Sequence, residues 1–147
     1  MNDIPTTCGC FLIYNDQMLI VHSTNHKWDQ WGIPKGLHDE GEMHDDAMFR
    51  EVHEETNIVI ADYQHYLFDI GYEFYIRQRK ALHAFVVILQ EWDYPPIFCA
   101  STFTRNDIIQ PEVDAFVWLP LQKALSMVQS EQVILFERNY NDIRRHL

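Results

Sequence analysis

The chain has 147 residues, with 22 Asp and Glu against 11 Lys and Arg, and therefore a formal net charge of −11. This length indicates a single domain over residues 1–147, and the 47% hydrophobic composition can form its core without disulfides. The net charge disfavours membrane binding and a stable complex with nucleic acid, because both partners are anionic. An odd number of cysteines without CxxC spacing, and the lack of any apolar stretch long enough for a membrane span, favour a cytoplasmic protein with reduced thiols.

The N-terminal half begins with two apolar segments, 6–14 and 18–22, joined through polar residues that start at Asn15. This arrangement predicts a β-hairpin of two buried strands. Residues 23–38 are polar and interrupted by glycine and proline, which predicts an ordered loop. Residues 42–56 predict a helix, because their apolar side chains recur on one face at helical spacing.

The C-terminal half alternates between strand-like and loop-like segments before it ends in helical periodicity. Mixed strands flanked by helices are typical of an α/β layered domain. The predicted elements are strands at 58–60, 63–75 and 81–91, of which the last two pair across a basic turn, a loop at 94–111, a strand at 115–119, and helices at 121–128 and 131–145.

Three carboxylates lie close together on the predicted helix. Glu51, Glu54 and Glu55 stand at positions i, i+3 and i+4, so they occupy one helical face. Three like charges destabilise an isolated helix, and a hard cation such as Mg²⁺ or Mn²⁺ would offset this effect. The adjacent Arg50 can neutralise or orient one of them. Charge spacing alone is also compatible with a solvated acidic face.

The spacing around these carboxylates extends over a longer motif. From Gly36 the chain runs five residues to Glu42, and seven more separate Glu42 from the segment REVHEETNI at 50–58. This pattern resembles the Nudix box, G-x5-E-x7-R-E-U-x-E-E-x-G-U with U aliphatic, and Asn57 occupies the position of its last glycine. The preceding WGIPKG at 31–36 also resembles the segment that leads into that box. The resemblance implies an α/β fold, the Nudix-type α/β/α sandwich with a mixed central sheet.

Asn57 is the one departure from the fixed positions of the box. It follows the predicted helix, where the chain often adopts a left-handed conformation that glycine accepts freely. Asparagine is the residue other than glycine that tolerates this conformation best. We therefore predict a left-handed Asn57 and an intact helix end.

The resemblance to the Nudix family implies a Mg²⁺-dependent hydrolase, in which Mn²⁺ can substitute, that cleaves a phosphoanhydride in a substituted nucleoside diphosphate. In such a reaction the cation lowers the pKa of a bound water and the protein supplies position. The implied roles are principal metal ligands for Glu54 and Glu55, a third ligand or general base for Glu51, a carbonyl ligand for Gly36, orientation of the glutamates for Arg50, and an outer bracing position for Glu42.

Five further residues are candidates for substrate binding or catalysis, each with a plainer alternative. Lys35 and Lys80 can hold phosphates, and Arg79 can assist them, although Lys80 and Arg79 also fit a solvated hairpin turn. Tyr72 offers a stacking surface for a base, but alternating aromatics on a strand are more often core residues. Glu112 is either an exposed turn carboxylate or a distal metal ligand or base.

Within the family, the segments at 34–36 and 112–119 and the position of Lys80 most resemble the diadenosine polyphosphate hydrolases. The implied partner is a small nucleotide such as diadenosine tetraphosphate, cleaved to ATP and AMP. RNA 5′-pyrophosphohydrolases, nucleoside triphosphate hydrolases and diphosphoinositol polyphosphate hydrolases are the alternatives. A catalytically silent module that senses a nucleotide is an alternative of another class.

Several histidines lie near the predicted helix. His53 begins a sequence similar to the zinc motif HExxH, but the second histidine is missing. His38 and His44 can approach His53 in space, yet no Cys or His partner has zinc-binding spacing. Surface histidines are therefore the favoured interpretation.

Overall fold

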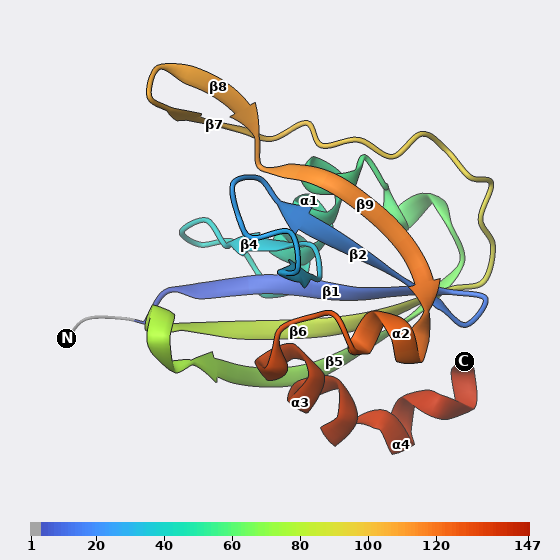
Figure 1. Cartoon of the computed structure of the whole chain (residues 1–147). Helices are drawn as coiled ribbons and strands as arrows, with labels where there is room; N and C mark the ends of the chain where they lie inside the picture. The colour runs from blue at the N-terminus through green and yellow to red at the C-terminus, as the bar shows by residue number, and fades with distance from the viewer. Residues whose placement is uncertain (1–3) are drawn as a thin grey trace.

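The computed structural model describes residues 4–147, which form a seven-stranded mixed sheet, a separate two-stranded sheet, and helices on both faces of the larger sheet (Figure 1). The strands of the larger sheet are β1 (Thr6–Tyr14), β2 (Gln17–Ser23), β3 (Trp31–Gly32), β4 (Lys35–Leu37), β5 (His65–Tyr75), β6 (Lys80–Leu89) and β9 (Val113–Pro120).

Strand β1 is the centre of the sheet and contacts three neighbours. It pairs antiparallel with β2 and β4 and parallel with β6, so the sheet is mixed as predicted. The β1–β2 turn has positive φ angles at Asn15 and Asp16, which fit the right-handed twist of a tight hairpin. Strands β5 and β6 form the predicted antiparallel pair, and β9 pairs with β2.

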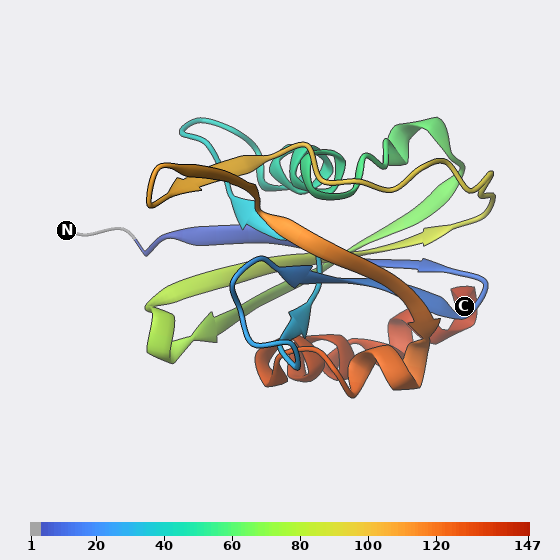
Figure 2. The same ribbon diagram turned by 45° about the horizontal axis from the view of Figure 1, so that its top comes forward.

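The helices divide into two layers around the sheet (Figure 2). Helix α1 (His44–Thr56) covers one face and buries Ala47, Met48 and Val52 against Cys8, Cys10 and Leu12 of β1. Phe11 and Ile13 point to the other face, because successive strand residues alternate. That face is covered by α2 (Leu121–Leu125), α3 (Ser130–Arg138) and α4 (Tyr140–Ile143). The three layers match the predicted α/β/α sandwich.

Helix α1 ends as the sequence predicts. Asn57 has φ 67° and ψ 7°, which is the left-handed conformation, and its backbone N–H donates to the carbonyl of His53 at 2.8 Å. Its side-chain amide donates to the carbonyl of Pro96 at 3.3 Å. The prediction of a left-handed Asn57 is therefore confirmed.

Four predicted segments differ from the structure. The loop at 23–38 contains β3 and β4, which are too short to produce a period-two pattern. The strand predicted at 58–60 is instead irregular chain that leads into a 3₁₀ turn (Ile60–Asp62), and Ile58 and Ile60 are buried in the core cluster that includes residues of α1. The continuous helix predicted at 131–145 is divided into α3, α4 and a 3₁₀ turn (Arg144–His146), because the Asn139 amide donates to the carbonyls of Leu135 and Ile70 at the break.

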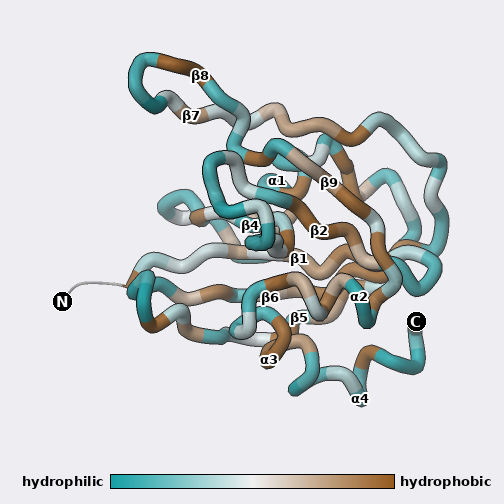
Figure 3. The backbone as a smooth tube through the Cα atoms, in the orientation of Figure 1, coloured by the Kyte–Doolittle hydropathy of each residue, from teal (hydrophilic) through white to brown (hydrophobic). Residues whose placement is uncertain are grey.

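The loop predicted at 94–111 contains a β-hairpin, β7 (Thr102–Arg105) and β8 (Ile108–Pro111). Its turn residues Asn106 and Asp107 have positive φ angles, as in the first hairpin, and the same Asn-Asp pair marks both turns in the sequence. The hairpin extends beyond the sheet and has a hydrophobic segment at β8, where Ile109 is 73% exposed (Figure 3). A third 3₁₀ turn (Ile76–Gln78) connects β5 to β6. Within residues 4–147, no helix combines the length and the apolar character needed to cross a membrane.

Candidate active site

Helix α1 presents three carboxylates toward β4 and the β8–β9 connection. Glu51 and Glu55 are 7% and 6% exposed, whereas the Glu54 side chain is 39% exposed. The difference follows from helix geometry, because Glu51 and Glu55 are one turn apart on the stripe that packs toward the sheet. Two ionisable groups therefore lie in a largely buried environment.

Gly36 of β4 leaves the space that the Glu51 carboxylate occupies. A Cβ atom built on Gly36 would overlap the carboxylate of Glu51. The first glycine of the motif is thus required for close approach of the helix side chain to the strand backbone. This contact places a backbone segment beside the carboxylates, as expected for a carbonyl ligand at Gly36.

Arg50 connects the loop before α1 with the helix carboxylates. Its Nε and Nη2 donate to the two carboxylate oxygens of Glu42 at 2.9 Å each, and Nη2 also donates to the carbonyl of Leu37 at 3.0 Å. Its Nη1 donates to Glu51 at 2.9 Å and to Glu54 at 3.2 Å. The Arg50 guanidinium holds the pKa of Glu42 down at about 2. The geometry fits the orienting role expected of Arg50 and the bracing position expected of Glu42.

Burial strongly perturbs the two inner carboxyls. Burial raises the pKa of Glu51 to about 7 despite the opposing charge of Arg50. Burial likewise raises the pKa of Glu55 to about 8, although Lys35 opposes this rise and its backbone N–H donates to Glu55 Oε1 at 2.9 Å. The ionised forms are thus poorly compensated by the protein. A cation at these oxygens would supply the missing compensation.

Glu112 comes from the connection between β8 and β9 and faces the helix carboxylates. It lines a cavity of about 520 Å³ together with Glu55, and an adjoining cavity of about 360 Å³ together with Glu51. Burial, followed by the charge of Glu54, raises the pKa of Glu112. The structure therefore places Glu112 at the site. The sequence alone did not distinguish this position from an exposed turn.

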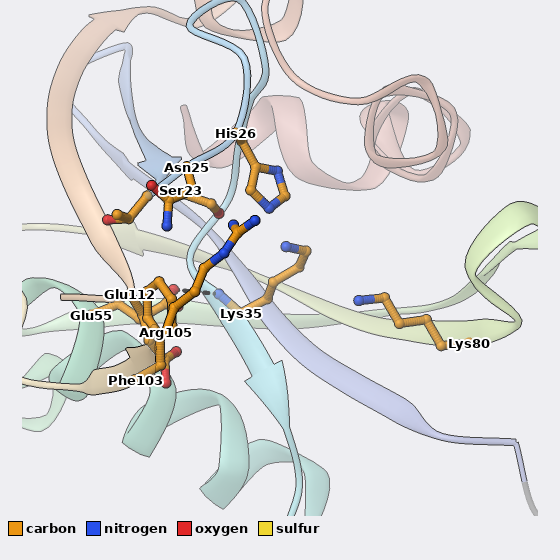
Figure 4. A pocket seen from close by; sticks show the side chains of 10 residues that line it. Ser23, Asn25, His26, Lys35, Glu55, Lys80, Phe103, Arg105 and Glu112 are labelled. Carbon is orange, nitrogen blue, oxygen red and sulfur yellow. Dashed lines mark hydrogen bonds between the residues drawn. The ribbon is translucent and has the colours of Figure 1, made fainter. Parts of the chain in front are cut away.

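Basic side chains occupy the other side of the larger cavity. Lys35 and Lys80 line both cavities, and burial, followed by the charge of Lys35, lowers the pKa of Lys80. Arg105 reaches the cavity from the β7–β8 hairpin and extends with Lys35 toward His26 (Figure 4). The cavity thus has carboxylates on one wall and cationic groups on another.

Two of the substrate-binding candidates lie outside these cavities. Arg79 is an exposed residue in the left-handed conformation at the β5–β6 turn. Tyr72 lies on the edge strand β5 and stacks on His83 with ring centroids 4.2 Å apart. Arg79 and Tyr72 line neither of these two cavities, so contact of either residue with the substrate stays a prediction.

The sequence analysis missed several residues that line the larger cavity. They come from the β2–β3 connection and from β7, two regions interpreted as loop without further assignment. Only the repeated Asn-Asp turn signal could have indicated the hairpin that carries Arg105. The missed residues are Ser23, Thr24, Asn25, His26 and Arg105.

The donor set fits a hard divalent cation. Glu51, Glu54 and Glu55 provide carboxylate oxygens on one helix face, and the Glu51 carboxylate lies against the backbone of Gly36. Oxygen ligands of this kind suit Mg²⁺ and Mn²⁺. The raised pKa values of Glu51 and Glu55 indicate that these carboxylates lack full compensation from the protein.

Comparison with known proteins agrees with this geometry. A sequence model of the NUDIX domain matches residues 4–138. An 8-oxo-(d)GTP phosphatase from Mycolicibacterium smegmatis is 27% identical over 116 residues, which cover 77% of this chain. The chain spans only about 30% of the length of that relative.

Solved structures show the same fold at low sequence identity. An Ap4A hydrolase binary complex from C. elegans aligns with a TM-score of 0.70 and 19% identity, covering 95% of this chain and 98% of that one. A bifunctional NMN adenylyltransferase/ADP ribose pyrophosphatase from Francisella tularensis, complexed with AMP and a Mn ion, aligns with a TM-score of 0.66 and 21% identity. That alignment covers 97% of this chain and 42% of the other.

Proposed function

The chain belongs to the Nudix family, and we propose that it is a divalent-metal-dependent pyrophosphohydrolase acting on a small nucleotide, with dinucleoside polyphosphates as the favoured substrates. The observation that carries the proposal is the division of one cavity between carboxylates and cations. Its lining includes the carboxylates Glu55 and Glu112 and also the basic residues Lys35, Lys80 and Arg105. A polyphosphate chain needs both, because metal ions and basic side chains neutralise different phosphate oxygens.

Each residue then has a defined task. Glu51, Glu54, Glu55 and the Gly36 carbonyl would hold Mg²⁺ or Mn²⁺, which supplies charge neutralisation and a water of lowered pKa. Arg50 keeps Glu51 and Glu54 in position through its hydrogen bonds. Lys35, Lys80 and Arg105 bind phosphates next to the carboxylates, so that the anhydride is aligned for in-line attack. Phe103 also lines this cavity and offers an aromatic surface.

Glu112 is the proposed general base. Glu51 already accepts a hydrogen bond from Arg50 and fills the space at Gly36, so it is better suited to a fixed ligand position. Glu112 lines both cavities, and its raised pKa suits proton uptake. Glu112→Gln should lower kcat by about 10²-fold with little change in KM. Glu137→Gln, on helix α3 across the sheet, is the matched control and should have no effect.

A panel of substrates tests the proposed activity. Diadenosine tetraphosphate, ADP-ribose, nucleoside triphosphates including 8-oxo-dGTP, and triphosphorylated RNA are incubated with Mg²⁺ or Mn²⁺, and products are separated by chromatography. We expect diadenosine tetraphosphate to give ATP and AMP, because one metal cluster beside one base-binding region cleaves at a fixed distance from the bound nucleoside. Two ADP would contradict this positioning. No turnover of any compound would favour a nucleotide-sensing module.

Nucleoside triphosphate hydrolysis is the second candidate. The relative from Mycolicibacterium smegmatis, named as an 8-oxo-(d)GTP phosphatase, supports it. Faster turnover of 8-oxo-dGTP than of the dinucleotide in the same panel would favour this candidate. Arg105→Ala also distinguishes the two candidate activities. Arg105 would contact phosphates beyond the scissile bond, so its loss should impair hydrolysis of the dinucleoside polyphosphate more than hydrolysis of the shorter nucleoside triphosphate. Arg77→Ala, exposed at the β5–β6 turn, is the control.

A further inference from the structure

A second group of metal-binding side chains lies at the N-terminal end of α1. It consists of Cys8 from β1, His38 from the segment after β4, and His44, the first residue of α1. One ligand atom from each of the three lies within 4.8 Å of the others. We call these residues the Cys–His cluster. They include none of the residues proposed for the Nudix carboxylate site.

His83 completes the surroundings of the cluster. It is adjacent to Cys8 in the register of the parallel strands β1 and β6, so the two side chains share one face of the sheet. Nδ1 of His83 and Nδ1 of His44 are 2.8 Å apart, and Nε2 of His83 is 2.8 Å from the carboxylate of Asp69. The three groups form a continuous chain of hydrogen bonds that ends at His44.

The hydrogen bonds determine the tautomer of each neutral ring. The Asp69 carboxylate accepts a hydrogen bond, so Nε2 of His83 carries the proton and Nδ1 of His83 accepts. His44 therefore donates through Nδ1 and keeps a lone pair on Nε2. His38 donates through Nδ1 to the carbonyl of Thr6 at 3.2 Å and likewise keeps a lone pair on Nε2. Both rings thus have the form in which histidine binds metals.

Hydrogen bonds of this kind orient metal-binding histidines. Such a histidine donates its other ring N–H to a carboxylate, a backbone carbonyl or water, which fixes its orientation and makes the ligating nitrogen more basic. Here the carbonyl of Thr6 accepts from His38, and His83, itself bonded to Asp69, accepts from His44. A surface histidine has no need of this support.

We infer that Cys8, His38 and His44 form a binding site for a thiophilic divalent cation, best matched by Zn²⁺. One sulfur and two imidazole nitrogens are typical zinc ligands, and a three-residue set leaves a fourth position for water. Tetrahedral zinc places its ligand atoms about 3.5 Å apart, so a contraction of roughly 1 Å closes the cluster. The hard carboxylate site and this softer site select different cations.

The cation would tie together three separate segments. Cys8 lies on the central strand, whereas His38 and His44 bracket the segment that contains Glu42, the partner of Arg50. A bond between these elements restricts that segment. Binding to the folded chain alone should also raise its melting temperature.

Cobalt substitution tests the inference directly. The protein is titrated with Co²⁺ in a large excess of Mg²⁺, so that the carboxylate site is occupied by the hard cation. We expect the near-ultraviolet charge-transfer band of a cobalt–thiolate bond and the visible bands of tetrahedral cobalt, saturating at equimolar metal. Zn²⁺ should abolish both by displacement. Wild-type protein without a thiolate band would overturn the inference.

Variants assign the band to the cluster. Cys8→Ala should remove the charge-transfer band, and His38→Ala should weaken Co²⁺ binding at least tenfold. Cys99→Ala and His53→Ala are the matched controls and should leave the spectrum unchanged. Loss of the band in Cys99→Ala, or unchanged binding in His38→Ala, would place the metal elsewhere and refute the site.

A second measurement covers the case in which Cys8→Ala fails to fold. His38 is only half-buried, so His38→Ala should fold normally, and Zn²⁺ in excess Mg²⁺ should raise the melting temperature of wild type but not of this variant. An equal rise in both proteins would contradict the inference. Neither measurement depends on hydrolase activity, so its outcome is distinct from that of the proposed function.

Discussion

Replacing Glu55 by glutamine should stabilise the metal-free protein while removing most of its proposed hydrolytic activity. The carboxyl is 6% exposed, and burial raises its pKa from 4.5 to about 8. At pH 7 the unfolded chain ionises this group freely, whereas the folded chain takes up a proton there. The folded state therefore carries a penalty of about 3 kcal/mol, taking 1.36 kcal/mol for each pKa unit between 4.5 and the working pH.

Glutamine has nearly the same shape and no charge, so it removes this penalty. Its side-chain oxygen can still accept the hydrogen bond from the Lys35 backbone N–H. In the presence of a chelator at pH 7, the melting temperature should rise by about 6 to 12 °C. With Mg²⁺ and substrate, kcat should fall by about 10²-fold or more, because a ligand of the metal-assisted water is lost.

The stabilisation expected for Glu55→Gln depends on pH. A carboxyl whose folded pKa is raised destabilises the protein increasingly as pH rises from 4.5 to 8. The difference in melting temperature between wild type and variant should therefore shrink as pH falls toward 4.5. Glu54→Gln is the control, since the Glu54 side chain is 39% exposed and its loss should not raise the melting temperature. A metal-free Glu55→Gln protein that melts at or below wild type at pH 7 would refute the reasoning.

Substitutions at three further positions test other parts of the structure. Asn57→Gly should be neutral or slightly stabilising, whereas Asn57→Val should cost about 1–2 kcal/mol in the left-handed conformation; equal melting temperatures would contradict this account. Gly36→Ala should displace the Glu51 carboxylate and lower kcat by about 10²-fold. An unchanged kcat in steady-state kinetics would show that the close contact between Gly36 and Glu51 is not needed. Lys80→Ala should raise KM more than it lowers kcat, since phosphate binding is shared by ground and transition states, while Tyr72→Ala serves as a control outside the cavity. An unchanged KM in Lys80→Ala would favour the alternative interpretation, in which this lysine belongs to a solvated hairpin turn.

The catalytic helix could be predicted in detail because its determinants are local. Glu51, Glu54 and Glu55 share one face for any helix with 3.6 residues per turn. Asn57 follows the helix directly, so its left-handed conformation depends only on the chain ending there. The spacing from Gly36 to Ile58 likewise spans the short strand β4, one loop and helix α1, and of these the helix is predicted from the sequence and confirmed by the fold.

Elements with weak periodicity could not be predicted in the same way. Strands β3, β4, β7 and β8 have two to four residues each, which is too short for an alternating pattern to differ from a loop. They form because neighbouring strands accept their backbone hydrogen bonds. The β7–β8 hairpin brings Arg105 to the cavity, and no pattern within its own segment indicates that destination.

The sequence by itself determined the local chemistry of α1: which carboxylates lie together, how the helix ends, and which family the spacing resembles. Only the tertiary structure decided which distant residues join them. Glu112 lies near the carboxylates, Tyr72 stacks on His83, and Cys8 lies close to His44 although thirty-six positions of chain separate them, because strand order and register select these neighbours. Helical contacts repeat every few residues and are visible in the sequence, whereas contacts across a mixed sheet depend on the packing of the whole chain.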